Sequence, residues 1–398
     1  RLAALWEPVL ECKALSTAPL SERAALTRVT DQLQRSGLIF HERTVYQFHT
    51  ALKVANEAPL LVLAGISGTG KSLLPQRYAA ALGINQLVIP VQPRWDGPQD
   101  LVGFFNHLEQ KYVATPLSRA LLQMHLRPEE HEHLHPPGFN SHSLSDQMLL
   151  VLLDEMNLAR VEYYFAEFLS RLETRRTLTH HSTEADRRHA SIPTECGTPP
   201  PNCAPLHLFP GSNVLFVGTM NEDETTQSLS DKVVDRANII RFGMPRHMKA
   251  PDTVAFEPHQ ERLAHETWSS WITAASLAAD DAARVQAFCD TINATLEPLG
   301  RAFGHRLLKA VSAYVRQYPA HVPDRDQTAL ADQIEMRILP RVRGVALADG
   351  TESLTTLTLL AREYEDEDLA SAIENAQQSE MAARDDRFHW AGLSRSVE

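Results

Sequence analysis

A glycine-rich stretch near residue 70 has the residue types and the spacing that hold phosphate groups. It follows the pattern G-x-x-x-x-G-K-[ST] and comprises Gly65, Ile66, Ser67, Gly68, Thr69, Gly70, Lys71 and Ser72. Glycines let backbone N–H groups curl around phosphate oxygens, and a helix after the loop directs the positive end of its dipole towards them. Lys71 would neutralise charge on the β- and γ-phosphates, and the Ser72 hydroxyl would be a ligand of Mg²⁺. The stretch therefore predicts a nucleotide-binding site.

Two adjacent carboxylates follow a second informative stretch. Residues 148–153 are continuously apolar and lead directly into Asp154 and Glu155. A run without alternation is typical of a strand that is buried on both faces of a parallel sheet, and the ends of such strands hold the chemistry of α/β folds. Here Asp154 would help to hold Mg²⁺, while Glu155 would orient and deprotonate the attacking water. The pair predicts hydrolysis of the bound nucleotide.

Polar residues near two later apolar runs are further candidates. Residues 213–221 end in Asn221, which either hydrogen-bonds the γ-phosphate or the attacking water, or only shapes a turn. An arginine just outside a nucleotide pocket can reach the γ-phosphate of a neighbouring subunit. Arg236, which precedes a short apolar run at residues 239–242, is the first choice for this role and Arg241 is the second. The alternative is that both are ordinary surface charges.

Local patterns assign these side chains to secondary-structure elements. Apolar runs predict strands at residues 60–64, 86–91, 148–153, 213–221 and 239–242. Helices are predicted from residue 71 to about 81, ending before Gly83, and at residues 117–125 and 161–172. Residues 95–106 and 111–116 predict a projecting hairpin. Its aromatic residues Phe104, Phe105 and Tyr112 either line a pore or are buried supports.

Composition limits the classes of function. The 398 residues are 43% hydrophobic and 22% charged, with a net charge of −12, which argues against a large nucleic-acid groove. Any contact with DNA is therefore expected to be local or made by parts outside this sequence. Four scattered cysteines do not make a disulfide framework, and no apolar run approaches the roughly 18 residues of a membrane span. We expect a cytoplasmic protein without a membrane segment, and the start at Arg1 indicates a piece of a longer chain.

Three stretches allow more than one interpretation. Residues 38–40 either cover the base of a nucleotide or pack in the core. Residues 126–147 are rich in proline and histidine, match no metal template and are expected to form a surface loop. Residues 173–210 are expected to form a long mobile insertion rather than a packed element. In that insertion Cys196 and Cys203, with His180 and His181, have a spacing too irregular to favour a zinc site.

Taken together, these motifs resemble the AAA+ ATPases, and within them the McrB-like group, which is related to the dynein-related and MoxR-like ATPases. The resemblance covers residues 37–242, with weaker support to residue 344. It rests on residues 63–72, 98–103 (Pro-Gln-Asp-Leu-Val-Gly), 153–160 (Leu-Asp-Glu-Met-Asn-Leu-Ala-Arg), 218–221 (Gly-Thr-Met-Asn) and 231–236 (Asp-Lys-Val-Val-Asp-Arg). By this likeness residues 65–72 are Walker A, Asp154 and Glu155 are Walker B, Asn221 is sensor 1 and Arg236 is the arginine finger.

The resemblance also implies an architecture. It predicts an α/β P-loop core with a parallel sheet flanked by helices, followed by an α-helical lid. The expected division is a helical lead-in at residues 1–35, a nucleotide-binding domain at 36–250, a lid at 251–350 and a helical extension at 351–398. Hairpins are expected at about residues 100–116 and before sensor 1. Helical patterns at 258–277, 281–296, 305–318 and 326–338 suit the lid, in which Arg306 is the sensor 2 candidate, with Arg341 and Arg343 as rivals.

The likeness implies partners and a substrate as well. AAA+ proteins of this kind form hexameric rings, and McrB proteins use GTP and bind a McrC-like nuclease that cuts modified DNA. After Asn221 this chain reads Glu-Asp-Glu-Thr, where McrB has a Thr-Ala-Asp-Arg-like run, so ATP and GTP both stay open. The leading hypothesis is the motor subunit of a DNA restriction or phage-defence system. The alternative is a MoxR- or dynein-like ATPase that remodels a protein complex, and a nucleotide-gated scaffold is a third.

Overall fold

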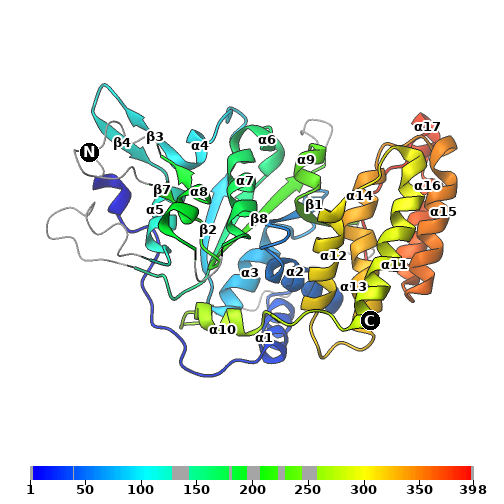
Figure 1. Cartoon of the computed structure of the whole chain (residues 1–398), viewed down its shortest axis with the longest axis horizontal. Coiled ribbons are helices and arrows are strands. Elements are labelled where there is room, and N and C mark those ends of the chain that lie inside the picture. The colour runs from blue at the N-terminus through cyan, green and yellow to red at the C-terminus, as the bar shows by residue number, and fades with distance from the viewer. Residues whose placement is uncertain are drawn as a thin grey trace.

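A central sheet with helices on both faces adjoins a block of C-terminal helices (Figure 1). The computed structural model describes residues 3–38, 40–127, 143–178, 182–194, 207–222, 229–243 and 258–395. The predicted fold class, a parallel α/β core followed by a helical region, is confirmed. Across these described ranges, no helix combines the length and the apolar character that crossing a membrane requires.

The central sheet contains five parallel strands. They are β1 (Leu60–Gly65), β2 (Asn85–Pro90), β5 (Leu149–Asp154), β8 (Val214–Asn221) and β9 (Ala237–Phe242), in the order β2-β5-β8-β1-β9. Their register places Gly65 of β1 directly opposite Asn221 of β8. Because the strands are parallel, the carboxyl ends of β1, β5 and β8 meet at one edge of the sheet. That edge collects Asp154, Glu155, Asn221 and the start of the glycine-rich stretch, whereas Arg236 directly precedes the amino end of β9.

The two faces of the sheet pack against different helices. Side chains alternate along each strand, so Leu61 and Leu63 of β1 join one apolar cluster while Leu60 and Val62 join the other. The first cluster includes α1 (Glu22–Arg35), α2 (Glu42–Lys53) and α3 (Leu73–Leu82), and the second includes α5 (Pro116–Gln123), α6 (Val161–Tyr164) and α7 (Ala166–Arg175). Burial stabilises the fold by roughly 1.5–3 kcal/mol for each such leucine side chain. The polar edge therefore rests on a rigid support.

The helix after the glycine-rich stretch ends where the sequence predicts. Gly83 caps α3 in the left-handed conformation at φ 74°, and its N–H donates to the Ala79 carbonyl. A Cβ atom at this position would lie 2.1 Å from the carbonyl oxygen of Glu261. Only glycine fits both the backbone angle and the close contact.

The predicted hairpin is present but shorter than expected. A single helical turn, α4 (Gln99–Val102), precedes strands β3 (Gly103–Asn106) and β4 (Lys111–Ala114), and Gly103 makes the transition at φ 90°. Phe105 and Tyr112 lie opposite each other and are buried, whereas Phe104 is 49% exposed. Of the three aromatic residues, two are therefore buried supports, and Phe104 alone among them remains available to a ligand.

Two further sequence predictions, on the helix after β5 and on the insertion, differ from the structure. The helix expected at residues 161–172 is interrupted at Phe165 and forms α6 and α7. In the stretch expected as a mobile insertion, α8 (Glu184–His189) is followed by β6 (Ile192–Pro193), which pairs with β7 (His207–Leu208). Ile192 and Leu208 are fully buried, so this part is packed because it contributes to the core. The zinc candidates His180, His181, Cys196 and Cys203, and most of the histidine-rich loop, lie outside the described residues.

The C-terminal part is helical, as predicted. Its elements are α10 (His265–Ser270), α11 (Ala279–Leu296), α12 (His305–Gln317), α13 (Arg325–Gln333), a π-helical segment (Ile334–Ile338), α14 (Leu339–Val342), α15 (Leu347–Glu363), α16 (Glu367–Gln377) and α17 (Glu380–Asp385). Between residues 258 and 277 only residues 265–270 are α-helical. Before this helix, Arg262 and Ala264 instead form β-bridges to Leu15 and Gln147. The helices from α11 to α16 share the first apolar cluster, which joins them to the core.

Residues 387–395 return to the sheet, and we call them the C-terminal strap. The Leu393 N–H donates to the Arg241 carbonyl of the edge strand β9 at 3.2 Å. Arg395 ion-pairs with Asp366 at 2.8 Å and with Glu335 at 3.1 Å, and all three side chains are buried. The strap therefore joins the edge strand beside β1 to the helical block.

His49 on α2 is a buried titratable group. Its Nδ1 lies 2.6 Å from the Tyr78 hydroxyl, and its Nε2 lies 2.9 Å from Glu22 Oε1. Burial lowers the pKa of His49, although the Glu22 carboxylate opposes the shift. The folded state therefore binds fewer protons at His49 than the unfolded state does. Its stabilising contribution is complete above the unfolded pKa of about 6.5 and is lost as the pH falls below it.

We expect the melting temperature to fall as the pH is lowered from about 7.5 to about 5.5, and to fall less steeply in a His49→Gln variant. One titrating group changes the free energy of unfolding by at most about 1.4 kcal/mol per pH unit. Thermal unfolding of both proteins across this range measures the difference in slope. His305→Gln, at an exposed position, is the matched control and should follow the wild-type slope. Parallel curves for His49→Gln and the wild type would contradict the assignment.

Candidate active site

The glycine-rich stretch forms a loop between β1 and α3, as its sequence predicts. Gly65, Gly68 and Gly70 have φ angles of 139°, 85° and 84°, which side chains other than hydrogen rarely allow. A Cβ atom at Gly65 would also lie 2.6 Å from the carbonyl oxygen of Phe242 on β9. The loop conformation therefore requires glycine, and we call residues 65–72 the glycine loop.

Lys71 lies under the loop. Its side chain is buried and its ammonium group donates to the Ile66 carbonyl, to which the Thr69 hydroxyl also donates at 3.0 Å. Burial lowers the pKa of Lys71, and the carboxylates of Glu222, Asp154 and Glu155 oppose this effect. A desolvated ammonium group is stabilised by a nearby anion, which a phosphate group would supply.

The structure brings Ser72 and Asp154 together across 82 residues of sequence. The Ser72 hydroxyl donates to Asp154 Oδ1 at 2.7 Å. A hydroxyl and a carboxylate oxygen beside a phosphate-binding loop are the donor set that Mg²⁺ prefers, so these residues fit that ion. Among the residues that the structure describes, no group of three or more histidine, cysteine, aspartate or glutamate side chains could hold a metal by itself.

Glu155 and Asn221 also lie together. The Asn221 amide Nδ2 donates to Glu155 Oε1 at 2.8 Å, and the Glu155 side chain is exposed at the edge of the sheet. Glu155 adopts the left-handed conformation with φ 53° and ψ 47°. This conformation costs a residue other than glycine of order 1–3 kcal/mol and persists only where the surroundings impose it. The carboxylate is therefore held in a defined place next to the glycine loop.

Two residues of this network were not predicted from the sequence. The Thr219 hydroxyl donates to Asp154 Oδ1 at 2.7 Å and accepts from the Glu155 N–H at 2.9 Å. The Asn157 amide donates to the Asn221 carbonyl at 2.7 Å. The alternation of side chains in a strand would have identified Thr219, because it lies two residues before Asn221 and so shares its face.

Residues 38–40 are partly described. Ile39 lies outside the described residues, whereas the Phe40 ring packs over the glycine loop, 3.0 Å from where a Cβ atom at Gly70 would lie. The same ring contacts Phe242 edge-on, with centroids 5.9 Å apart. Phe40 therefore supports the glycine loop. Its contact with a nucleotide base stays a prediction.

Arg236 and Arg306 meet at one carboxylate. Arg236, after α9 (Asp231–Val234), contacts both oxygens of Glu173 on α7, with Nε 3.0 Å from Oε1 and Nη2 3.2 Å from Oε2. Arg306 at the start of α12 approaches Glu173 Oε1 at 3.2 Å. In the described part of the chain, the ion pair of Arg306 is thus with Glu173 of α7, the carboxylate that also holds the arginine finger candidate Arg236.

The other arginine candidates have different surroundings. Arg241 is buried, with its guanidinium 2.8 Å from Glu222 and 2.8 Å from the carbonyl oxygen of Trp390 in the strap. It therefore points into its own chain rather than towards a neighbouring subunit. Arg343 ion-pairs at 3.0 Å with the same Glu222, which follows Asn221 in the sequence. Arg341 instead ion-pairs with Asp235 at 2.7 Å.

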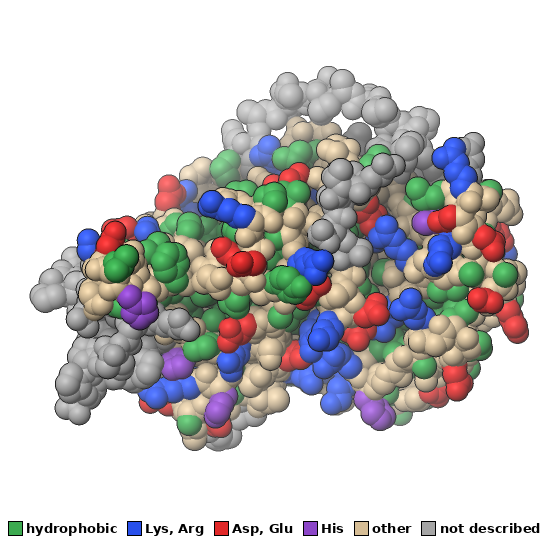
Figure 2. All heavy atoms as spheres, turned by 90° about the horizontal axis from the view of Figure 1, so that it is seen from above, with side chains coloured by type: hydrophobic (Ala, Val, Ile, Leu, Met, Phe, Trp, Pro, Cys, Tyr) green, Lys and Arg blue, Asp and Glu red, His purple; other side chains and the backbone are tan. Residues whose placement is uncertain are grey.

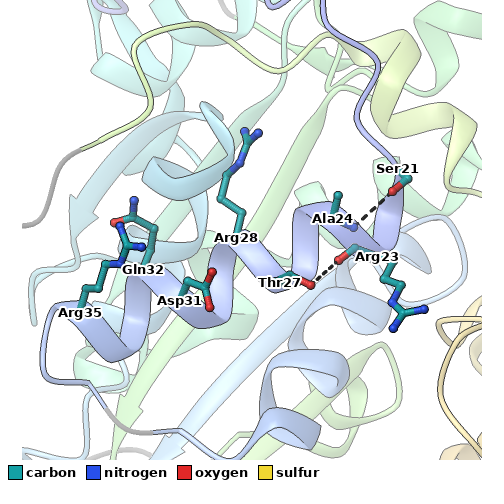
Figure 3. Close-up of a pocket in the computed structure, with 8 residues that line it drawn as sticks. All are labelled: Ser21, Arg23, Ala24, Thr27, Arg28, Asp31, Gln32 and Arg35. Atoms are coloured by element: carbon teal, nitrogen blue, oxygen red, sulfur yellow. Dashed lines mark hydrogen bonds between the residues drawn. The ribbon is translucent and has the colours of Figure 1, made fainter.

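A surface hollow of about 600 Å³ lies elsewhere, along the outer face of α1 (Figure 3). It is lined by Ser21, Arg23, Ala24, Thr27, Arg28, Asp31, Gln32 and Arg35, none of which is a predicted site residue. Arg23 and Arg28 point away from each other, so the basic side chains do not converge on one ligand. The hollow is therefore separate from the network around Asp154.

Comparisons with known proteins find two family models and a solved structure that are similar to parts of this chain. Residues 60–237 match the model of the AAA domain, dynein-related subfamily. Residues 260–384 match a domain of unknown function, DUF8727. No curated protein matches the chain. A crystal structure of a candidate ATPase from Cytophaga hutchinsonii is 15% identical and has a TM-score of 0.47, covering 85% of this chain and 94% of that one. The AAA match includes the glycine loop, Asp154, Glu155, Asn221 and Arg236, and ends before Arg306.

Proposed function

We propose that the chain is an AAA+ nucleoside triphosphatase that works as an oligomeric motor. The proposal starts from the match of residues 60–237 to the AAA domain of the dynein-related subfamily. The observation that carries the proposal is the convergence of the glycine loop, Asp154, Glu155 and Asn221 at one edge of the sheet. Such a set can bind a triphosphate and place a carboxylate beside the water that attacks it.

Each side chain has a distinct role in the proposed reaction. The backbone of the glycine loop and Lys71 bind the phosphates, and Ser72 and Asp154 hold Mg²⁺. The ion, when bound, neutralises charge on the β- and γ-phosphates. Glu155 orients the attacking water and accepts its proton. Asn221 holds the Glu155 carboxylate in place, and the γ-phosphate is its other proposed partner.

The arrangement of the arginines favours a site that is shared between subunits. The Arg236 side chain is 22% exposed and is held by Glu173 on α7, not by a residue of the glycine loop. In a ring, proposed to be hexameric, Arg236 stabilises charge on the γ-phosphate of the neighbouring subunit. Of the sensor 2 candidates, Arg306 pairs with the same Glu173, whereas Arg343 pairs with Glu222, the residue after Asn221, which makes Arg343 the stronger candidate.

The proposed biological role is the motor subunit of a McrB-like restriction or phage-defence system that works with a separate McrC-like nuclease. The alternative is an ATPase that remodels a protein complex, and the match to the dynein-related subfamily supports it equally well. Acidic and basic side chains are interspersed over the face shown in Figure 2, which suits local rather than extensive contact with DNA. The proposed division is a nucleotide-binding domain at residues 36–250, a lid at 251–350 and an extension at 351–398, in the cytoplasm.

Phosphate release with ATP and with GTP, measured in parallel over a range of protein concentrations, tests the proposal. We expect Mg²⁺-dependent release whose rate rises faster than linearly with protein concentration, because a shared site forms only on assembly. A preference for GTP would favour the McrB-like role, whereas a preference for ATP would leave the two roles level. Release that stays at the buffer background with both nucleotides at every concentration would refute the hydrolase proposal.

A further inference from the structure

Thr219 occupies a central position among the acidic residues of the site. It lies on β8, between β5 and β1, and its side chain is 2% exposed. Its single hydroxyl donates to Asp154 Oδ1 at 2.7 Å and accepts from the Glu155 backbone N–H at 2.9 Å. One oxygen atom therefore contacts both members of the carboxylate pair, although it is not itself at the exposed edge.

We propose that Thr219 is a positioning residue that sets the orientation of Asp154 and Glu155 together, and so couples the cation-binding carboxylate to the carboxylate that activates water. The inference rests on the proposed hydrolase function and assigns a role that goes beyond it. Thr219 contacts neither nucleotide nor water in this scheme, and it acts only through its two neighbours.

The physical argument begins with the backbone of Glu155. Glu155 adopts a left-handed conformation at φ 53°, which is energetically unfavourable for a residue other than glycine. In this conformation its carboxylate accepts a hydrogen bond from the Asn221 amide. The hydrogen bond from its N–H to the Thr219 hydroxyl holds the backbone end, while the Asn221 amide holds the carboxylate end. With the first bond removed, the Glu155 N–H loses this acceptor and the residue can relax towards an ordinary conformation.

The same hydroxyl acts on Asp154. Asp154 Oδ1 accepts from both Ser72 and Thr219 at 2.7 Å, so two donors hold this carboxylate oxygen in place. Threonine is suited to this task because its branched Cβ restricts χ1, and the hydroxyl is therefore held in one direction. Valine would preserve the shape of the side chain and remove only the hydroxyl, whereas serine would preserve the hydroxyl.

The test compares Thr219→Val and Thr219→Ser with the wild type in three measurements. We expect Thr219→Val to lower kcat by about 10²-fold, the size of effect that a small misplacement of a reacting group produces, with KM nearly unchanged. It should also raise the Mg²⁺ concentration needed for half-maximal binding of a fluorescent ATP or GTP analogue, which requires no turnover. Thr219→Ser should stay close to the wild type in both respects, and melting temperatures report folding.

Thr358→Val is the matched control, because Thr358 is also buried and donates to the Leu354 carbonyl inside α15, away from the site. It should leave kcat and the Mg²⁺ midpoint unchanged. The inference is overturned if folded Thr219→Val matches the wild type in both readouts, or if Thr219→Ser is impaired as strongly as Thr219→Val. If Thr219→Val does not fold, Thr219→Cys replaces it, because cysteine has a similar size and a weaker hydrogen-bond donor. We then expect a kcat between that of the wild type and that of an inactive enzyme.

The outcomes separate this inference from the hydrolase proposal. A wild type without turnover refutes the hydrolase proposal, and the Mg²⁺ midpoint of Thr219→Val then decides the role of Thr219 by itself. A wild type with turnover and an unaltered Thr219→Val refutes the positioning role and leaves the hydrolase proposal intact.

Discussion

Replacing Glu155 by glutamine is expected to abolish nucleotide hydrolysis while nucleotide binding is retained. Glutamine has the same shape, and its amide oxygen can still accept from the Asn221 amide, as Glu155 Oε1 does at 2.8 Å. It cannot accept a proton from water, and loss of a general base typically lowers a rate by about 10²–10⁴-fold. Phosphate release measures the loss, and titration with a fluorescent nucleotide analogue measures the affinity.

Glu162→Gln is the matched control for this variant. Glu162 lies on α6, a few residues after Glu155, and is partly exposed, so its replacement removes one nearby negative charge without touching the network. We expect its rate to equal that of the wild type. Persistent turnover in Glu155→Gln would show that another group activates the water.

Replacing Arg236 by alanine is expected to eliminate the hydrolysis that depends on assembly and to leave nucleotide binding unaffected. An arginine finger contributes about 10³–10⁵-fold to the rate of phosphoryl transfer, because it stabilises charge that develops on the γ-phosphate. Arg301→Ala is the control. Arg301 is a 39%-exposed arginine whose ion pair with Asp231 is 3.5 Å long, so it shares the region but not the pairing with Glu173.

Co-expression of the two inactive variants sharpens this prediction. A ring that contains both has interfaces at which the Glu155→Gln subunit supplies an intact Arg236 to a neighbour with an intact Glu155. We therefore expect mixed assemblies to regain part of the wild-type phosphate release, which neither variant shows alone. Mixed assemblies without any regained activity would mean that Arg236 does not act between subunits.

The parts of the fold that local sequence patterns predicted are those with strong local causes. The apolar runs of β1, β5 and β8 have the short length that favours buried strands over helices, and the glycine loop combines a motif with backbone angles that glycine alone adopts readily. The ends of these strands meet because parallel strands share a carboxyl edge. That rule predicted a chemical role for Asp154 and Glu155, whereas for Asn221 the role of sensor 1 came from the resemblance to the AAA+ ATPases.

The features that were not predicted depend on contacts between distant segments. No local pattern marks Phe165 as the break between α6 and α7, and the pairing of β6 with β7 depends on partners separated by 13 or more residues. The position of Arg306 follows from how the helical block packs on the core, so its approach to Glu173 could not be read from residues near it. The catalytic roles of Glu155, Asn221 and Arg236 remain predictions that the variants above test.

The C-terminal strap limits how the helical block can move relative to the sheet. Leu393 is hydrogen-bonded to the edge strand of the sheet, and Arg395 is ion-paired to Asp366 and Glu335 of the helical block. A tie of this kind removes degrees of freedom, because the block cannot rotate away from the sheet without stretching or releasing the segment that spans them. In the proposed oligomeric motor, a stroke that leaves the strap in place would move sheet and block together, and displacement would then arise at the boundaries between subunits.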